Sequence, residues 1–305
     1  MSNDTPRRSP RPRAAIATIP AYVPGRPPTA QPGRTTWKLS SNENPFPPPP
    51  GVVRAVAEAA ATMNRYPDMG CTALYAALAR RLAVDPEQLA AGTGSVAVLY
   101  HLLQAFCDPG DEVVYAWRSF EAYPIAVAVT GATSVQVPLA ADARHDLDAM
   151  AAAVTDRTKA VIVCTPNNPT GPAVTHHQLE QLVARIPSDV LVVVDEAYRE
   201  FVRADDPADP MRLLSRHPNV VVMRTFAKAY GLAGLRIGYL VADRAVATAA
   251  RACGLPFGVS SVAQAAALAC LEDEATLLNR VDEIVGERER VVAALREQGW
   301  DIPDA

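Results

Sequence analysis

Short runs of β-branched and other apolar residues alternate with stretches of helical spacing along most of this chain. The runs read as strands at residues 112–115, 160–164, 190–194, 220–223 and 237–241. They are apolar on both faces, which is typical of strands in a largely parallel sheet covered by helices on each side. Helical spacing predicts covering helices at residues 52–63, 72–82 and 95–106. The sequence therefore predicts an α/β fold.

Proline divides the chain into regions. About half of the 27 prolines fall in the first 50 residues, so we expect residues 1–45 to form an extended arm. The regular pattern predicts a large domain over residues 46–252. Beyond it the sequence is helical from about residue 261 to 297, with a break near 272–274 and a helix stop at Gly299. We expect residues 253–305 to begin a second, smaller domain.

The net charge and the cysteines of the chain indicate which ligands and which cell compartment to expect. A net charge of -4 argues against nucleic acid, whose binding needs a concentrated basic surface, so small-molecule ligands are expected. The five cysteines include no CxxC pair, which indicates neither a metal site nor a disulfide framework and favours the cytoplasm. No apolar run is long enough to predict a membrane span. We expect a solvated tail around four early arginines, Arg7, Arg8, Arg11 and Arg13.

Polar residues directly follow several of the predicted strands. In open parallel sheets ligands gather at the carboxyl ends of strands, so these positions are the candidate site. Together they supply an amide, a carboxylate, a phenol, an amine, hydroxyls and an aromatic face. The segments are residues 94–96, 117–120, 165–171, 195–198 and 224–228.

This set of groups matches the needs of pyridoxal 5'-phosphate (PLP). Asp195 could face the ring nitrogen and keep it protonated, although a lone Asp after a strand is more often a helix cap. Asn168 and Tyr198 could donate to the phenolate oxygen. Lys228 could form a Schiff base, although most lysines are surface residues. The presence of all four groups favours the functional interpretation over the structural ones.

The phosphate of such a cofactor also has candidate ligands. Gly94 and Ser95 precede a helix that opens at Val96, and backbone N–H groups at a helix start bind anions. Thr225 and Arg236 lie on either side of Lys228 and could converge on the same phosphate. Phe120 offers a ring for stacking, or a core aromatic.

Taken together, five stretches resemble the fold-type I PLP-dependent aminotransferases of class I and II. The branch is that of histidinol-phosphate aminotransferase, and the similarity is greatest to actinobacterial aromatic (phenylalanine) aminotransferases. The resemblance implies a mostly parallel seven-stranded sheet, a small α/β domain, PLP, a homodimer, and an amino donor with a 2-oxo acid. The stretches are residues 40–45, 64–68, 165–171, 195–198 and 224–238, the last reading RTFAKAYGLAGLRIG.

The resemblance also implies roles for individual residues. Lys228 carries the cofactor, with Asp195 and Tyr198 completing the catalytic set. Tyr66 reaches the cofactor of the other subunit. The substrate side chain is expected near Tyr22, Asn44 and Tyr123, of which the first two lie on a lid segment. The remaining cofactor ligands are Gly94, Ser95, Val96, Phe120, Asn168, Thr225 and Arg236.

The chain departs from the family pattern in two places. Ala227 stands where the family usually has a phosphate-binding serine. Family members also continue past residue 305 to an arginine that binds the substrate carboxylate, so we expect an incomplete small domain and poor turnover.

The substrate is suggested by two segments, WRSFEAYP and NRYPDMGC, which favour an aromatic amino acid with 2-oxoglutarate as acceptor. The alternatives are histidinol-phosphate transamination and an inactive or non-catalytic PLP-binding paralogue.

Overall fold

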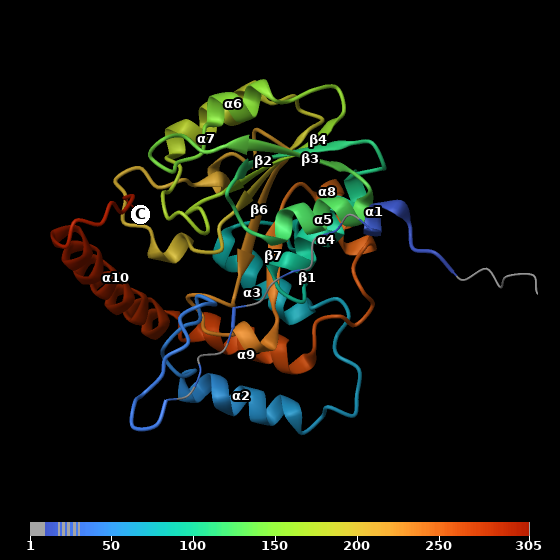
Figure 1. Cartoon of the computed structure of the whole chain (residues 1–305). Coiled ribbons are helices and arrows are strands. Elements are labelled where there is room, and N and C mark those ends of the chain that lie inside the picture. Colours follow the sequence, from blue (N-terminus) through green and yellow to red (C-terminus); the bar gives the residue numbers. More distant parts are fainter. Residues whose placement is uncertain are drawn as a thin grey trace, which may run out of the picture.

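The computed structural model describes residues 10–17, 19, 22, 25–26, 29 and 31–304, and within them a seven-stranded sheet lies between two layers of helices (Figure 1). Across the sheet the strand order is β1-β7-β6-β5-β4-β2-β3. Strand β7 runs antiparallel to both of its neighbours, and the other pairs are parallel. The predicted α/β fold is confirmed. The strands are β1 (Leu89–Gly92), β2 (Glu112–Trp117), β3 (Thr133–Pro138), β4 (Thr158–Cys164), β5 (Leu191–Asp195), β6 (Val220–Thr225) and β7 (Gly238–Val241).

The two helical layers follow from the alternation of side chains along the strands. In β5, Leu191 and Val193 pack into one core cluster, while Val192 and Val194 pack into the other. Helices α4, α5 and α8 cover the first face, and α3, α6, α7 and α9 cover the second. The α-helices are α1 (Ala14–Ala17), α2 (Pro50–Ala60), α3 (Thr72–Leu82), α4 (Ser95–Phe106), α5 (Ala122–Thr130), α6 (Leu147–Ala152), α7 (His176–Arg185), α8 (Arg244–Ala252), α9 (Ser261–Glu272) and α10 (Glu274–Glu297). Short 3₁₀ helices are η1 (Pro86–Gln88), η2 (Arg199–Phe201), η3 (Pro210–Arg212) and η4 (Ala233–Leu235).

Most predicted boundaries agree with the structure, but one strand was missed and the arm expected to be extended over residues 1–45 contains the short helix α1. The break in the C-terminal helical region falls at Asp273, and Gly299 has a φ of 86° just beyond α10. Strand β3 was not predicted, because it pairs with β2 alone at the edge of the sheet and is mostly half-buried or exposed. Arg11 and Arg13 are exposed, as expected of solvated residues, and the Arg13 guanidinium donates to the Val129 carbonyl at 2.5 Å. Arg7 and Arg8 lie outside the described residues.

The long helix α10 lies beside the segment that carries Lys228. Its buried Val281 and Val285 pack against Ala229, the residue after that lysine. Among the described residues, no helix is both long enough and apolar enough to cross a membrane. The expected domain boundaries at residues 45/46 and 252/253 stay a prediction.

Candidate active site

A cavity of about 530 Å³ opens at the carboxyl ends of β4, β5 and β6, beside the start of α4. Because these strands are parallel neighbours, the polar residues that follow them emerge at one edge of the sheet. The structure therefore brings together all of the predicted same-subunit cofactor residues. The cavity is lined by Gly94, Ser95, Val96, Phe120, Asn168, Asp195, Tyr198, Thr225, Lys228 and Arg236, and also by Tyr22.

Asp195 ends β5 in the layer beneath the cavity, where the residue is 5% exposed. Its Oδ2 accepts a hydrogen bond from the Tyr123 hydroxyl at 2.7 Å, and its Oδ1 accepts one from the Ala197 backbone N–H at 3.2 Å. Burial raises the pKa of Asp195, while these two hydrogen bonds act in the opposite direction. The carboxylate is thus held in one orientation at the cavity wall.

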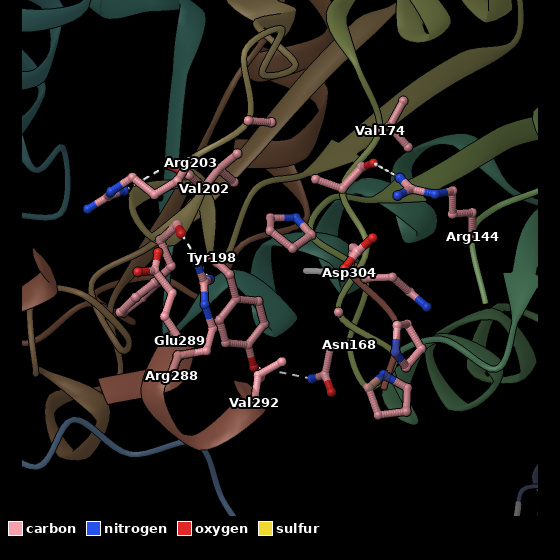
Figure 2. Close-up of a pocket in the computed structure, with 18 of the residues that line it drawn as sticks. Arg144, Asn168, Val174, Tyr198, Val202, Arg203, Arg288, Glu289, Val292 and Asp304 are labelled. Atoms are coloured by element: carbon pink, nitrogen blue, oxygen red, sulfur yellow. Dashed lines mark hydrogen bonds between the residues drawn. The ribbon is translucent and has the colours of Figure 1, made fainter. Parts of the chain in front are cut away.

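Tyr198 points its hydroxyl toward two amides. Asn168 Nδ2 donates to the phenol oxygen at 3.2 Å (Figure 2). Asn42 Nδ2 donates to the same oxygen at 3.1 Å. Desolvation raises the pKa of Tyr198 to about 12, so the phenol keeps its proton near neutral pH. The hydroxyl is therefore a neutral group with a proton to donate.

Lys228 follows β6 and is half-buried. Its Nζ donates to the backbone carbonyls of Ser41 and Asn42, each at 3.3 Å, and lies 5.5 Å from the centre of the Tyr198 ring. Burial lowers the pKa of Lys228, and nearby Arg236 lowers it further against the opposite effect of Glu43. A lysine with a lowered pKa supplies more of the neutral amine that acts as a nucleophile.

The start of α4 and Arg236 form a cradle for an anion. Gly94 takes a φ of 94° just before the helix, and a Cβ at Gly94 would come within 2.6 Å of an Arg236 guanidinium nitrogen. A side chain at this position would push the guanidinium away, and the φ of 94° strains any residue other than glycine. Helix N–H groups with a guanidinium are the donor set that a phosphate needs. Thr225 joins them and accepts a bond from the Ala227 N–H at 3.0 Å.

Two aromatic residues complete the wall of the cavity. Phe120 is half-buried, and its ring meets that of Tyr123 edge-on at 5.7 Å. One side of Phe120 thus rests on the core while the residue lines the cavity. Tyr22 lines the cavity from the N-terminal arm and is 55% exposed.

Three predicted site residues do not line this cavity. Tyr123, expected near the substrate, is fully buried beneath Asp195. Asn44 uses its amide to bond the backbone carbonyls of Lys228 and Ala229, at 3.2 and 3.1 Å. Tyr66 is 83% exposed and packs its ring against Phe257 at 4.7 Å. The role of Tyr66 concerns a second subunit and stays a prediction.

Sequence reasoning missed two contributors to the site. Asn42 bonds Tyr198, and Ser41 accepts from Lys228, although each pair is more than 150 residues apart in the chain. Both residues lie in the segment 40–45, whose resemblance to the aminotransferases was the one signal that pointed to a role at the site. Their contacts depend on how the arm crosses the sheet edge, and no local pattern predicts that.

A second cavity of about 690 Å³ adjoins the first and shares Asn42, Asn168, Pro169 and Tyr198 with it. Figure 2 shows the Asn168 amide pointing toward the Tyr198 hydroxyl, with the α10 residues Arg288 and Val292 close to Tyr198 in this view. Among the described residues, no three His, Cys, Asp or Glu side chains are grouped so as to hold a metal ion.

Comparison with known proteins identifies the family of this chain. The family model for aminotransferase class I and II matches residues 34–305, so the chain belongs to this family. Its relatives include an aromatic amino acid aminotransferase of Streptomyces avermitilis, 57% identical over 296 residues that cover 97% of this chain and 82% of the relative. The enzyme of the same name from Streptomyces coelicolor is 56% identical, with coverage of 97% and 82%. The predicted family is confirmed.

Solved structures agree with this assignment. Histidinol-phosphate aminotransferase from Sinorhizobium meliloti, in complex with PLP, superposes with a TM-score of 0.81 at 33% identity, covering 87% of this chain and 72% of that one. Aspartate aminotransferase from Thermus thermophilus with maleate gives a TM-score of 0.78 at 28% identity, covering 87% and 74%. The aminotransferase fold is thus shown by both sequence and structure.

Proposed function

We propose that this chain is a PLP-dependent transaminase that moves the amino group of an aromatic amino acid, such as phenylalanine, to 2-oxoglutarate. The observation that carries the proposal is one cavity in which Lys228, Asp195 and the Tyr198–Asn168 pair meet the anion cradle of α4. The relatives named as aromatic amino acid aminotransferases support the choice of substrate.

The residues present fit PLP. Arg236, Thr225 and the backbone N–H groups at residues 94–96 would hold its phosphate. Asp195 would face the ring nitrogen, because it is the buried carboxylate in the cavity wall. Phe120 would contact one ring face. Ala227 contributes no hydroxyl, so one hydrogen bond of the family pattern, worth about 0.5–1.5 kcal/mol, is expected to be missing.

The chemistry is divided between the cofactor and the chain. When bound, PLP supplies a protonated pyridine ring that stabilises negative charge at the substrate α-carbon. Lys228 Nζ, whose pKa is lowered by burial, would hold the cofactor and move the proton at that carbon. Tyr198 would donate a hydrogen bond from its hydroxyl to the phenolate oxygen of the cofactor. The carbonyls of Ser41 and Asn42 would orient the lysine amine.

The adjoining cavity supports an amino donor with a large side chain. It begins at Tyr198 and Asn168, and its wall has both apolar and charged parts. Phe201, Val202 and Val292 add apolar surface, and the charged residues are Arg144, Arg203, Arg288, Glu289, Arg296 and Asp304. The aromatic side chain of a donor bound in the first cavity would extend past Tyr198 into this second cavity.

Histidinol phosphate is the second candidate donor, favoured by the similarity to the Sinorhizobium enzyme. To decide, the two donors are offered separately to the PLP-saturated chain with 2-oxoglutarate, and glutamate formation is measured. We expect a higher kcat/KM with phenylalanine. A preference for histidinol phosphate would contradict the proposed substrate, and PLP binding without turnover of either donor would support the non-catalytic alternative.

We also propose a homodimer in which Tyr66 reaches the cofactor of the other subunit. Exposed apolar residues support an interface near Tyr66, and they include Met63, Met69, Leu255 and Phe257. Mixing Tyr66→Phe chains, which should bind PLP more weakly, with inactive Lys228→Ala chains at limiting PLP tests this, because hybrid dimers hold one intact site. We expect activity to return on mixing. Sedimentation as a monomer, or mixtures that stay inactive, would contradict the dimer.

We propose the cytoplasm as the location of the protein. All five cysteines are free and four are buried, as suits a reducing compartment. Cell fractionation tests this proposal, and recovery outside the cytoplasmic fraction would contradict it.

A further inference from the structure

The phenol oxygen of Tyr198 is shared by two amide groups from distant parts of the chain. Asn42 lies on the N-terminal arm and Asn168 lies in the loop after β4, and each Nδ2 is within 3.2 Å of the oxygen. An amide nitrogen only donates hydrogen bonds, so Tyr198 is the acceptor in both contacts. Both acceptor positions of the phenol are therefore occupied by the protein.

This arrangement fixes what Tyr198 can do in the cavity. With its acceptor positions filled, the hydroxyl has one remaining interaction, which is donation of its proton. Two donors on the oxygen also polarise the O–H bond and strengthen that donation. A ligand atom next to Tyr198 must therefore be a hydrogen-bond acceptor.

The amide of Asn42 is itself held in place by contacts around Lys228. The backbone carbonyl of Asn42 accepts from Lys228 Nζ, and Asn44 donates to the backbone carbonyls of Lys228 and Ala229. Asn42 also takes a φ of 49°, a left-handed conformation that asparagine tolerates better than most residues. The segment thus presents the Asn42 amide to Tyr198 in a defined position.

We infer that Asn42 is a positioning residue that, with Asn168, directs the Tyr198 hydroxyl proton toward an acceptor oxygen of the bound cofactor. The inference rests on the proposed function for the identity of that cofactor. Asn42 acts through Tyr198, whereas Asn168 has a second N–H left for the ligand. Neither the family pattern nor the sequence assigned this role to Asn42.

A double-mutant cycle tests the inference. Asn42→Ala, Tyr198→Phe and the double variant are titrated with PLP, and the pH at which the absorbance of bound PLP changes is measured. Asn42→Ala should weaken binding roughly two- to tenfold, as loss of one hydrogen bond does. Asn279→Ala is the matched control, because Asn279 is an exposed asparagine on α10 away from the cavity.

The pH of the absorbance change separates positioning from a structural role. Donation from Tyr198 makes the cofactor oxygen less basic, so the proton it holds leaves at lower pH. In Asn42→Ala the absorbance of bound PLP should therefore change at a higher pH than in the unsubstituted chain. The shift should be smaller than the one caused by Tyr198→Phe. Lys228 lies over the Tyr198 ring, and the titratable groups that act on these two residues are unchanged in these variants; they are Asp195, Cys164, Tyr22, Glu43 and Arg236.

In the Tyr198→Phe background, Asn42→Ala should add no further change in binding or in pH. The same loss of affinity in both backgrounds, or an unchanged pH of the absorbance change in Asn42→Ala, would overturn the inference. Turnover of phenylalanine by the unsubstituted chain would uphold the proposed function in that case. Failure of the unsubstituted chain to bind PLP would overturn both.

Discussion

The Tyr123 hydroxyl donates a 2.7 Å hydrogen bond to Asp195 Oδ2 in the fully buried layer beneath the cavity. Because burial alone raises the pKa of Asp195, this bond helps to keep the group ionised. A buried carboxylate held in one orientation, with hydrogen bonds that favour its charged form, is what a protonated ring nitrogen requires as its partner.

Removing that bond should shift the pH dependence of the enzyme. In Tyr123→Phe the pKa of Asp195 rises further, and the ionised form is lost as pH falls through a higher value. The acidic limb of the kcat/KM profile should therefore move to higher pH, with weaker PLP binding. Tyr115→Phe is the matched control, since Tyr115 is a buried tyrosine that accepts from Gln136 instead. Identical profiles for Tyr123→Phe and the unsubstituted chain would show that the bond does not tune Asp195.

Removal of one partner from the ion pair beside this carboxylate should be strongly destabilising. Arg224 Nε and Nη2 each lie 2.8 Å from Glu196 Oε2, and both side chains are almost fully buried. Glu196→Gln leaves the arginine charge buried and uncompensated, at a cost of about 3–5 kcal/mol in unfolding free energy. The double variant Glu196→Gln/Arg224→Met should lose less than the sum of the single variants in urea denaturation. Strict additivity would count against a coupled pair.

Glycine at position 238 should be required for the anion cradle. A Cβ at Gly238 would lie 2.4 Å from the Ser95 backbone nitrogen, so Gly238→Ala must displace the start of α4. We expect a loss of about 1–3 kcal/mol in stability and weaker binding of PLP. Gly234→Ala is the control, because no atom lies within 4 Å of its added Cβ. Isothermal titration that gives equal PLP affinity for both variants would exclude this effect of Gly238.

The sequence predicted the strand ends well because apolar runs followed by polar residues are local signals. Asp195, Tyr198 and Lys228 were predicted to share a site, and they line one cavity. This agreement follows from the rule that parallel strands bring their carboxyl ends to one edge.

Contacts between distant segments were beyond such signals. Tyr123 lies on α5, and its burial under Asp195 depends on how that helix packs on the sheet. The bond from Asn42 to Tyr198 depends on the path of the arm. Strand β3 has the mixed burial of an edge strand, which local apolar runs do not reveal.

The most direct test of the central claim is the covalent attachment of PLP to Lys228. The chain contains three lysines, Lys38, Lys159 and Lys228, so each can be replaced in turn. The PLP-treated protein is reduced with borohydride, digested and examined by mass spectrometry. We predict a single modified peptide containing Lys228, retained in Lys38→Ala and Lys159→Ala and absent from Lys228→Ala. A modification that persists in Lys228→Ala, or no modification of the unsubstituted chain, would contradict the account.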